Sequence, residues 1–279
     1  MPRMPSIELK NVQSVSLLAG TKICDARCPF CVAELTPTHG LSNREVEIPI
    51  PRLRDILEYG RQGNAKTLMI TGKGEPTLFP EHITKFLEET REFEEKTGFK
   101  FQKKELQSNG IRVAHYPEKY HAYLDRWKTL GLQTFIVSIV HYDPEENRKN
   151  YVPYLNSYID LDKTVQTLHQ HGLAVRLGCI AYNGGIDSRE KLVKLINLTM
   201  RIGADELTVR SVATSDTTQS AGVHQWIKEH ELTPEQHNDM YQFLEQEGLI
   251  LTRYPFGGTI YRLGSGTSGK VIENTRFLS

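Results

Sequence analysis

Cysteine is scarce in this sequence, and long apolar runs are missing from it. Only four of the 279 residues are cysteine, which argues against a disulfide-stabilised secreted domain. No run of about 18 apolar residues occurs, so no transmembrane helix is expected. The first ten residues carry no apolar segment after Arg3, so they do not predict a secretory signal. We therefore expect a cytoplasmic protein without a membrane partner.

An excess of charge of either sign is also missing. Lysine plus arginine number 34, as do aspartate plus glutamate, so the formal net charge is zero. Electrostatic capture of nucleic acid needs a basic surface, so this balance argues against a nucleic-acid partner. The hydrophobic content of 38% is ordinary for a globular protein, and the length is sufficient for a sizeable core.

Three of the four cysteines are concentrated in one short segment. Cys24, Cys28 and Cys31 follow a C-x3-C-x2-C spacing, whereas Cys179 is remote. Three close thiolates suit a soft metal site, and a cubane iron–sulfur cluster normally takes four cysteines. A loop that offers three leaves one iron open to another ligand. The alternatives are a zinc site with His39 as fourth ligand, whose spacing departs from the usual paired pattern, or reduced cysteines without metal.

Strand patterns and helix patterns alternate along most of the chain. Strands are predicted over residues 14–18, 67–71, 104–108, 134–140, 174–180 and 207–210. Helices are predicted over residues 50–60, 81–96, 119–130 and 161–171, with a fifth opened by a capping box at 187–190 and ending near Gly203. Such alternation predicts a parallel sheet, in which ligands bind beyond the carboxyl ends of the strands.

The cysteine segment, with Phe30 directly before its last cysteine, resembles the signature of the radical S-adenosylmethionine (SAM) superfamily. The resemblance implies an α/β fold, a partial (β/α)6 TIM-like barrel most similar to the molybdenum-cofactor biosynthesis protein A-like group. It implies that Cys24, Cys28 and Cys31 hold one [4Fe-4S] cluster and that SAM chelates the open iron. An external one-electron reductant such as flavodoxin or ferredoxin then drives SAM cleavage to a 5′-deoxyadenosyl radical, which abstracts hydrogen from a substrate.

Further short motifs follow the later strands and carry the same resemblance. The segment Gly72–Leu78 looks like the family's GGEP-type turn, with Lys73 at a position where the family often has glycine. Ser108 and Asn109 look like its polar turn after the third strand. The resemblance implies that the cofactor-binding residues are Phe30, Gly74, Glu75, Ser108, Asn109, Ser138, Arg176 and Asn183.

Alternation along the last two strands of the barrel places charges on its inner face. Arg176 lies on the inner face of the fifth strand, and Glu206 and Arg210 lie on that of the sixth. Buried charges must be paired or used, so Arg176 and Glu206 either satisfy one another or contact SAM or a polar substrate. The candidate substrate-binding residues are Lys73, His141, Tyr182, Glu206 and Arg210.

The composition changes after Arg210. Residues 211–222 are rich in serine and threonine, and either line the substrate pocket or form a solvated connector. A capping box at 233–236 predicts a helix to about Glu247, followed by strands at 249–252 and 259–263 and a glycine-rich turn at 264–269. We expect residues 1–210 to form the core and residues 211–279 to form an α+β appendage that closes the barrel. This appendage lacks cysteine, so one cluster per chain is expected.

Three functions remain open from the sequence. The first is a radical SAM enzyme that acts on a small polar metabolite. The second is a radical SAM enzyme that modifies a peptide or protein, as a maturase or a glycyl-radical activase does. The third is not enzymatic: a zinc-binding interaction module built on the same three cysteines.

Overall fold

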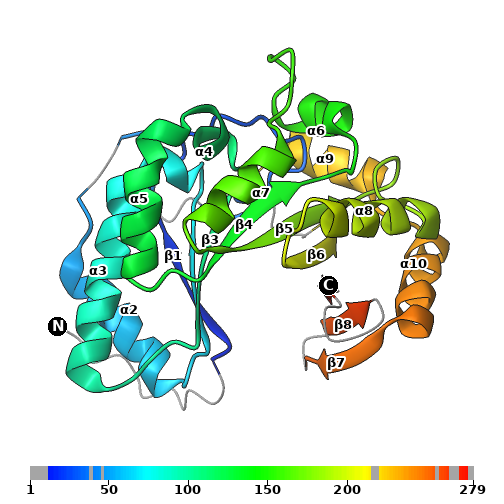
Figure 1. The fold of residues 1–279 in the computed structure, drawn as a ribbon. Coiled ribbons are helices and arrows are strands. Elements are labelled where there is room, and N and C mark those ends of the chain that lie inside the picture. Colours follow the sequence, from blue (N-terminus) through cyan, green and yellow to red (C-terminus); the bar gives the residue numbers. More distant parts are fainter. Residues whose placement is uncertain are drawn as a thin grey trace.

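Six parallel strands form the centre of the protein. The computed structural model describes residues 12–37, 40–44, 47–214, 220–254, 258–263 and 270–275. The strands pair in chain order, each parallel to the next, which confirms the expected partial barrel (Figure 1). Their bounds are β1 Ser14–Leu18, β2 Thr67–Thr71, β3 Lys103–Ser108, β4 Thr134–Ile139, β5 Ala174–Ala181 and β6 Glu206–Ser211.

The predicted helices connect successive strands and cover the outside of the sheet (Figure 1). They are α2 Ile50–Gln62, α3 Pro80–Thr97, α5 Pro117–Thr129, α7 Leu161–Gln170 and α8 Arg189–Arg201. The cap of α8 differs from the expected box: Ser188 accepts the N–H of Lys191, and Lys191 occupies the position that a box gives to glutamate or glutamine. Among the described residues, no helix is long and apolar enough to cross a membrane.

Four short elements were not predicted, and each follows the carboxyl end of one of the first four strands. They are α1 Val32–Leu35, the 3-10 helix η1 Pro76–Leu78, α4 Ile111–His115 and α6 Pro144–Tyr151. Segments of three to eight residues show too few turns for helical periodicity to appear in the sequence. These elements build the end of the barrel at which the cysteine segment lies.

The C-terminal part continues the same sheet. It contains α9 Ala221–His230, which was not predicted, then α10 Pro234–Glu247, β7 Leu249–Arg253, β8 Thr259–Leu263 and β9 Lys270–Thr275. Strand β9 pairs parallel with β6, while β8 and β7 pair antiparallel, giving one nine-stranded sheet. The capping box of Thr233 and Gln236 on α10 is confirmed. The glycine-rich turn at 264–269 lies outside the described residues.

The strands separate an apolar outer face from a polar inner one. On β5, Val175, Leu177 and Cys179 are buried in the core against the helices. Arg176, on the opposite face, is also buried. The alternation predicted from the sequence is therefore present, and the inner face of the barrel carries charged side chains.

A buried ion pair fastens α3 to β3, and its loss should destabilise the fold. Lys104 Nζ lies 2.8 Å from Glu94 Oε2, with the two side chains only 11% and 9% exposed, and Glu94 also accepts the N–H of Phe101. Glu94→Ala should lower the free energy of unfolding by about 3 kcal/mol, because it leaves a buried ammonium without its counter-charge. Chemical denaturation measures this.

The neighbouring glutamate provides the matched control. Glu95 pairs with Arg91 at the surface and is 65% exposed. Glu95→Ala should change stability by less than about 0.5 kcal/mol. Equal losses for the two variants would contradict the importance of the buried pair.

Candidate functional site

The three clustered cysteines lie on the loop between β1 and α1. None of the four cysteines forms a disulfide; Cys24 is exposed, Cys28 and Cys31 are partly buried, and Cys179 is buried. Loss of solvation raises the pKa of Cys24 to about 12, and it also raises that of Cys28, where the charges of Cys31 and Cys24 add to the effect. A metal binds cysteine as the thiolate, so a bound cation would favour ionisation of these neighbouring thiols.

The geometry of these thiols fits a cluster better than a single metal ion. Among the described residues, no three His, Cys, Asp or Glu side chains converge on a point that would hold a single ion. A cubane cluster does not need such convergence, since each cysteine binds a different iron. His39, the fourth ligand of the zinc alternative, lies outside the described residues.

The turn after β2 packs directly against the start of the cysteine loop. The N–H of Glu75 donates to the carbonyl of Ile23 at 2.9 Å. A Cβ on Gly74 would lie only 2.0 Å from that same carbonyl oxygen. Glycine is therefore required at position 74 by the close approach of two backbones, and this contact sets the distance between the β2 turn and Cys24.

The carboxylate of Glu75 is buried and held from several sides. Its Oε1 accepts the N–H and the hydroxyl of Thr77 at 2.9 and 2.6 Å, and the hydroxyl of Ser108 at 2.7 Å. Among the described residues, its Oε2 accepts one hydrogen bond, from the N–H of Asn109 at 2.9 Å, and so retains capacity for another donor. Desolvation raises the pKa of Glu75, while the hydrogen bonds from Asn109, Thr77 and Ser108 oppose that shift.

Asn109 connects the end of β3 to the cysteine loop. Its Nδ2 donates to Asp25 Oδ1 at 2.7 Å, and its Oδ1 accepts the N–H of Ile111. Arg112 Nε donates to the other oxygen of Asp25 at 2.8 Å, and the hydroxyl of Tyr154 donates to the Asp25 carbonyl. Asp25, Arg112 and Tyr154 were not predicted from the sequence. The signal available for Asp25 was an acidic residue within the cysteine spacing.

Phe30 belongs to an aromatic cluster beneath the loop. Its ring packs edge-on against Tyr151 at 5.8 Å, stacks on Tyr182 at 6.4 Å and lies 5.6 Å from Trp226 of α9. The hydroxyl of Tyr182 accepts a hydrogen bond from Asn150 Nδ2 at 3.1 Å. The structure thus brings Phe30 and Tyr182 together as packing partners, through a helix that the sequence analysis did not predict.

Lys73 is placed differently from the expectation that it faces a substrate. Its ammonium donates to the carbonyl oxygens of Ala33 and Thr36 at 2.5 and 2.9 Å, and to the Thr36 hydroxyl at 2.5 Å. These three acceptors match the three protons of an ammonium group. Desolvation lowers the pKa of Lys73, and its observed position fastens α1 to the β2 turn.

Arg176 and Glu206 lie in a charged network away from the loop. Arg176 donates to Glu206 Oε2 at 2.5 Å and to Glu105 Oε1 at 2.8 Å, and Lys103 lies 3.0 Å from Glu206. Arg176 is the third residue of β5, about 16 Å of strand before Ala181. The structure therefore realises the self-satisfied pairing and does not bring these two residues to the other candidates.

Ser138 and His141 lie at the end of β4. Ser138 is partly exposed on the inner face, and its carbonyl accepts the hydroxyl of Tyr158 at 3.3 Å. His141 is buried, and its Nδ1 accepts the N–H of Asp143 at 3.0 Å. Desolvation lowers the pKa of His141, and because Nδ1 accepts the N–H of Asp143, the neutral ring carries its proton on Nε2.

Asn183 and Arg210 follow the neighbouring strands. Asn183 is exposed after β5, its N–H donates to the carbonyl of His230, and its Oδ1 accepts from Gln236 Nε2 at 2.9 Å. Asn183 thus connects to α9 and α10 instead of converging with Glu75. Arg210 is partly buried at the penultimate position of β6.

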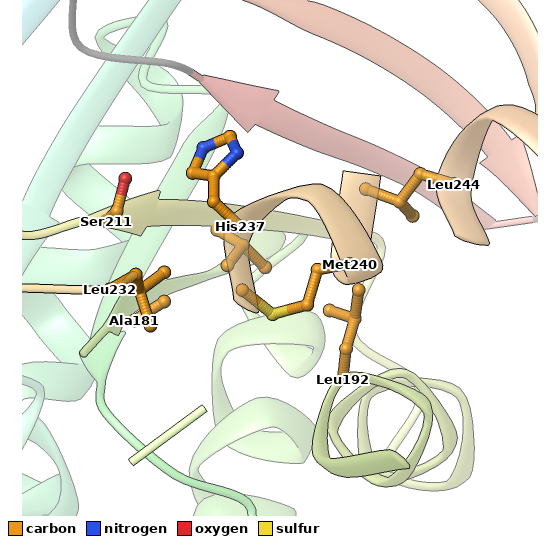
Figure 2. A pocket seen from close by; sticks show the side chains of 8 residues that line it. Ala181, Leu192, Ser211, Leu232, His237, Met240 and Leu244 are labelled. Atoms are coloured by element: carbon orange, nitrogen blue, oxygen red, sulfur yellow. The ribbon is translucent and has the colours of Figure 1, made fainter. Parts of the chain in front are cut away.

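A small, partly open pocket lies on the helix side of the sheet. Figure 2 shows Met240 of α10 beside Leu192 of α8, below the ends of β5 and β6. Its lining contains none of the expected cofactor or substrate residues. Ser211 lines this pocket, and residues 215–219 of the connector lie outside the described residues. The lining residues are Ala181, Leu192, Val209, Ser211, Leu232, His237, Met240 and Leu244.

The contact at Gly74 leads to a stability prediction. Gly74→Ala should cost about 1–3 kcal/mol or more, because the added Cβ would overlap the Ile23 carbonyl and the backbone of the cysteine loop would have to shift. Thermal unfolding of the metal-free protein measures the loss. Gly222, in α9, has open space around its Cβ position, so Gly222→Ala should be neutral or stabilising. Identical effects at both positions would contradict the close approach.

Comparisons with known proteins agree with this arrangement. Residues 18–199 match the model of the Radical SAM superfamily, whereas no curated protein matches the sequence significantly. SuiB from Streptococcus suis bound to S-adenosylmethionine is similar in structure, with TM-score 0.51 and 16% identity over 86% of this chain and 45% of that chain. HydG, a maturase of the [FeFe]-hydrogenase, has TM-score 0.57 and 13% identity over 83% and 49%.

A third similar structure is native anSMEcpe with bound AdoMet, with TM-score 0.54 and 12% identity over 84% of this chain and 61% of that chain. The chain therefore spans about half the length of the structures it resembles, and these low identities show a shared fold. Because the superfamily model covers more than half of the sequence, this chain belongs to the radical SAM superfamily.

Proposed function

We propose that this chain is a radical SAM enzyme whose cysteine loop holds one [4Fe-4S] cluster. The observation that carries the proposal is the direct attachment of this loop to the turns after β2 and β3, through Ile23, Glu75, Asn109 and Asp25. Three thiols and a buried carboxylate with remaining acceptor capacity are thereby fixed in one place. A cluster held there and reduced by an external donor such as flavodoxin or ferredoxin would supply the electron for cleavage of SAM into methionine and a 5′-deoxyadenosyl radical.

Different residues of the protein are proposed to bind the cluster and SAM. Cys24, Cys28 and Cys31 would each hold one iron, and Oε2 of Glu75, which also accepts the N–H of Asn109, would accept a hydrogen bond from the SAM ammonium. Thr77 and Ser108 occupy Oε1 and so fix the direction of Oε2. In this proposal Gly74, Ser108, Asn109 and Phe30 act mainly by positioning the loop, and Ser138 and Asn183 remain candidates for the ribose and adenine.

The substrate is proposed to be a small polar metabolite. Arg210, His141 and Tyr182 follow or lie near the carboxyl ends of β6, β4 and β5, which is the end at which the cysteine loop lies. Lys73 and Glu206 leave the set of substrate candidates because their charges are bound within the protein. Arg210, a charged residue near the carboxyl end of β6, supports a polar ligand over an apolar one.

A peptide substrate is the second candidate, and one feature favours it. Strand β7 is exposed along its whole length, including Leu249, Ile250 and Leu251, and within the described residues it pairs only with β8. An extended peptide could add to such an edge by backbone hydrogen bonds. Metabolite profiling with and without the enzyme, beside a proteome-wide search for modified peptides, separates the two candidates.

We also propose a division of the chain into two parts, a cellular compartment and a subgroup of the superfamily. We infer a catalytic core over residues 1–210 and a closing element over 211–279, supported by the pairing of β9 with β6. Four unbridged cysteines support a reducing compartment such as the cytoplasm. The segment 181–187, which begins at the last residue of β5 and resembles the corresponding loop of the molybdenum-cofactor biosynthesis protein A-like group, supports a place near that group.

The cluster assignment is tested by removing single cysteines. Replacing Cys24, Cys28 or Cys31 with alanine should abolish iron and sulfide binding and the broad visible absorption of a cluster, because each position supplies one of only three thiolate ligands. Cys179→Ala is the matched control and should retain full iron, since that thiol lies in the core on the outer face of β5. Full iron loading of the Cys28→Ala protein would refute the assignment, as would bound zinc without iron in the wild type.

The role of Glu75 is tested by SAM binding. Glu75→Gln keeps the shape of the side chain but removes its charge, so SAM affinity should fall by roughly 10- to 100-fold while iron content stays near normal. Isothermal titration under anaerobic conditions measures the dissociation constant. Glu34→Gln, at an exposed position on α1, should leave the affinity unchanged. An unaltered constant in Glu75→Gln would remove Glu75 from the SAM site.

A further inference from the structure

Asp25 is the only acidic side chain inside the cysteine loop, and it is largely buried. Its side chain is 12% exposed, although it directly follows Cys24. Arg112 Nε donates to Oδ2 at 2.8 Å and Asn109 Nδ2 donates to Oδ1 at 2.7 Å, so both carboxylate oxygens are held. The carboxylate therefore has a fixed position beside the first cysteine.

Arg112 is fixed from its other side as well. Its guanidinium lies over the ring of Tyr116, 5.5 Å from the ring centroid, while Nε donates to Asp25. Asn109 Nδ2 lies 4.0 Å from Cys24 Sγ in addition to its bond to Asp25. The pair of opposite charges and the first cysteine thus share one rigid group of contacts, which joins the cysteine loop to the start of α4.

Charges held in a fixed position beside a cluster ligand affect the reduction potential of the cluster. A cluster gains negative charge on reduction, and its potential depends on nearby charge, hydrogen bonds to sulfur and solvent exposure. The side chain of Asp25 is 12% exposed and that of Arg112 is 34% exposed, so the carboxylate in particular is screened less than a charge at the surface. The Asp25 carboxylate alone would disfavour reduction, and the Arg112 guanidinium alone would favour it.

We propose that the Asp25–Arg112 pair sets the reduction potential of the cluster, with Arg112 cancelling the field of the carboxylate. This inference rests on the proposed function, because it requires a cluster on the three cysteines. Two further charged residues lie in the loop, Lys22 and Arg27; Arg27 is exposed beside Tyr154, and solvent weakens its effect. Asp25 of the loop and Arg112 of α4 carry opposite charges, and removing each charge separately should have opposite results.

The test measures the midpoint potential of the cluster in the anaerobically purified protein, by redox titration followed by electron paramagnetic resonance. Asp25→Asn leaves the guanidinium without its counter-charge and should shift the potential upward. Arg112→Gln leaves the carboxylate without its counter-charge and should shift it downward. The double variant should return close to the wild-type value, because both charges are removed.

Two control variants separate charge from shape. Arg112→Lys keeps the positive charge and should keep the wild-type potential. Arg126→Gln changes the net charge by the same amount at a surface pair with Glu88, and should have no effect. A shift in Arg112→Lys equal to that of Arg112→Gln would overturn the electrostatic role.

The remaining outcomes are decisive as well. Shifts of the two single variants in the same direction, or no shift in either, would overturn the inference. Loss of iron from either variant would assign the pair to holding the loop and would overturn the tuning role. A wild-type protein without iron and sulfide would refute the proposed function itself, and this result is distinguished from the others by metal analysis before any titration.

Discussion

The close packing of three turns at one end of the barrel is the constraint on which the site depends. The backbone at Gly74 approaches the carbonyl of Ile23 so closely that no side chain fits. Glu75 then joins the β2 turn to the β3 turn through Asn109, and Asn109 joins both to Asp25 of the cysteine loop. A displacement of any of these turns would move the thiols relative to the carboxylate, so the local order of the loop derives from its neighbours.

The opposite end of the barrel has a different role. Lys103, Glu105, Arg176 and Glu206 satisfy one another across β3, β5 and β6, near the amino ends of these strands. Buried ion pairs of this kind contribute little net stability but penalise any arrangement in which one partner is missing. The charges therefore favour one register of the strands, while the carboxyl ends remain available for ligands. This division agrees with the general placement of sites in parallel α/β barrels.

The C-terminal elements contribute to the site through packing. Trp226 of helix α9 packs against Phe30 and Tyr182. The carbonyl of His230, the last residue of α9, accepts the N–H of Asn183. The cysteine loop is thus supported on one side by the β2 and β3 turns and on the other by an aromatic cluster. Each aromatic contact of this kind adds about 0.5–1.5 kcal/mol beyond its buried area, so the cluster helps to hold a loop that has no disulfide of its own.

The sequence by itself determined the six barrel strands, the long helices between them, their order and the location of the cysteine loop, but not the short helices at the strand ends or α9. Buried strands such as 67–71 and capped helices such as α10 produce local patterns, because hydrophobic periodicity and hydrogen-bonding caps depend on residues close in the chain. Only the tertiary structure decided which charged residues meet. Lys73 donates to Thr36 at the end of α1, Arg176 donates to Glu105, and Arg112 donates to Asp25, across separations of 37 to 87 residues. Partner choice among buried charges follows from strand register and loop packing, which local sequence patterns do not contain.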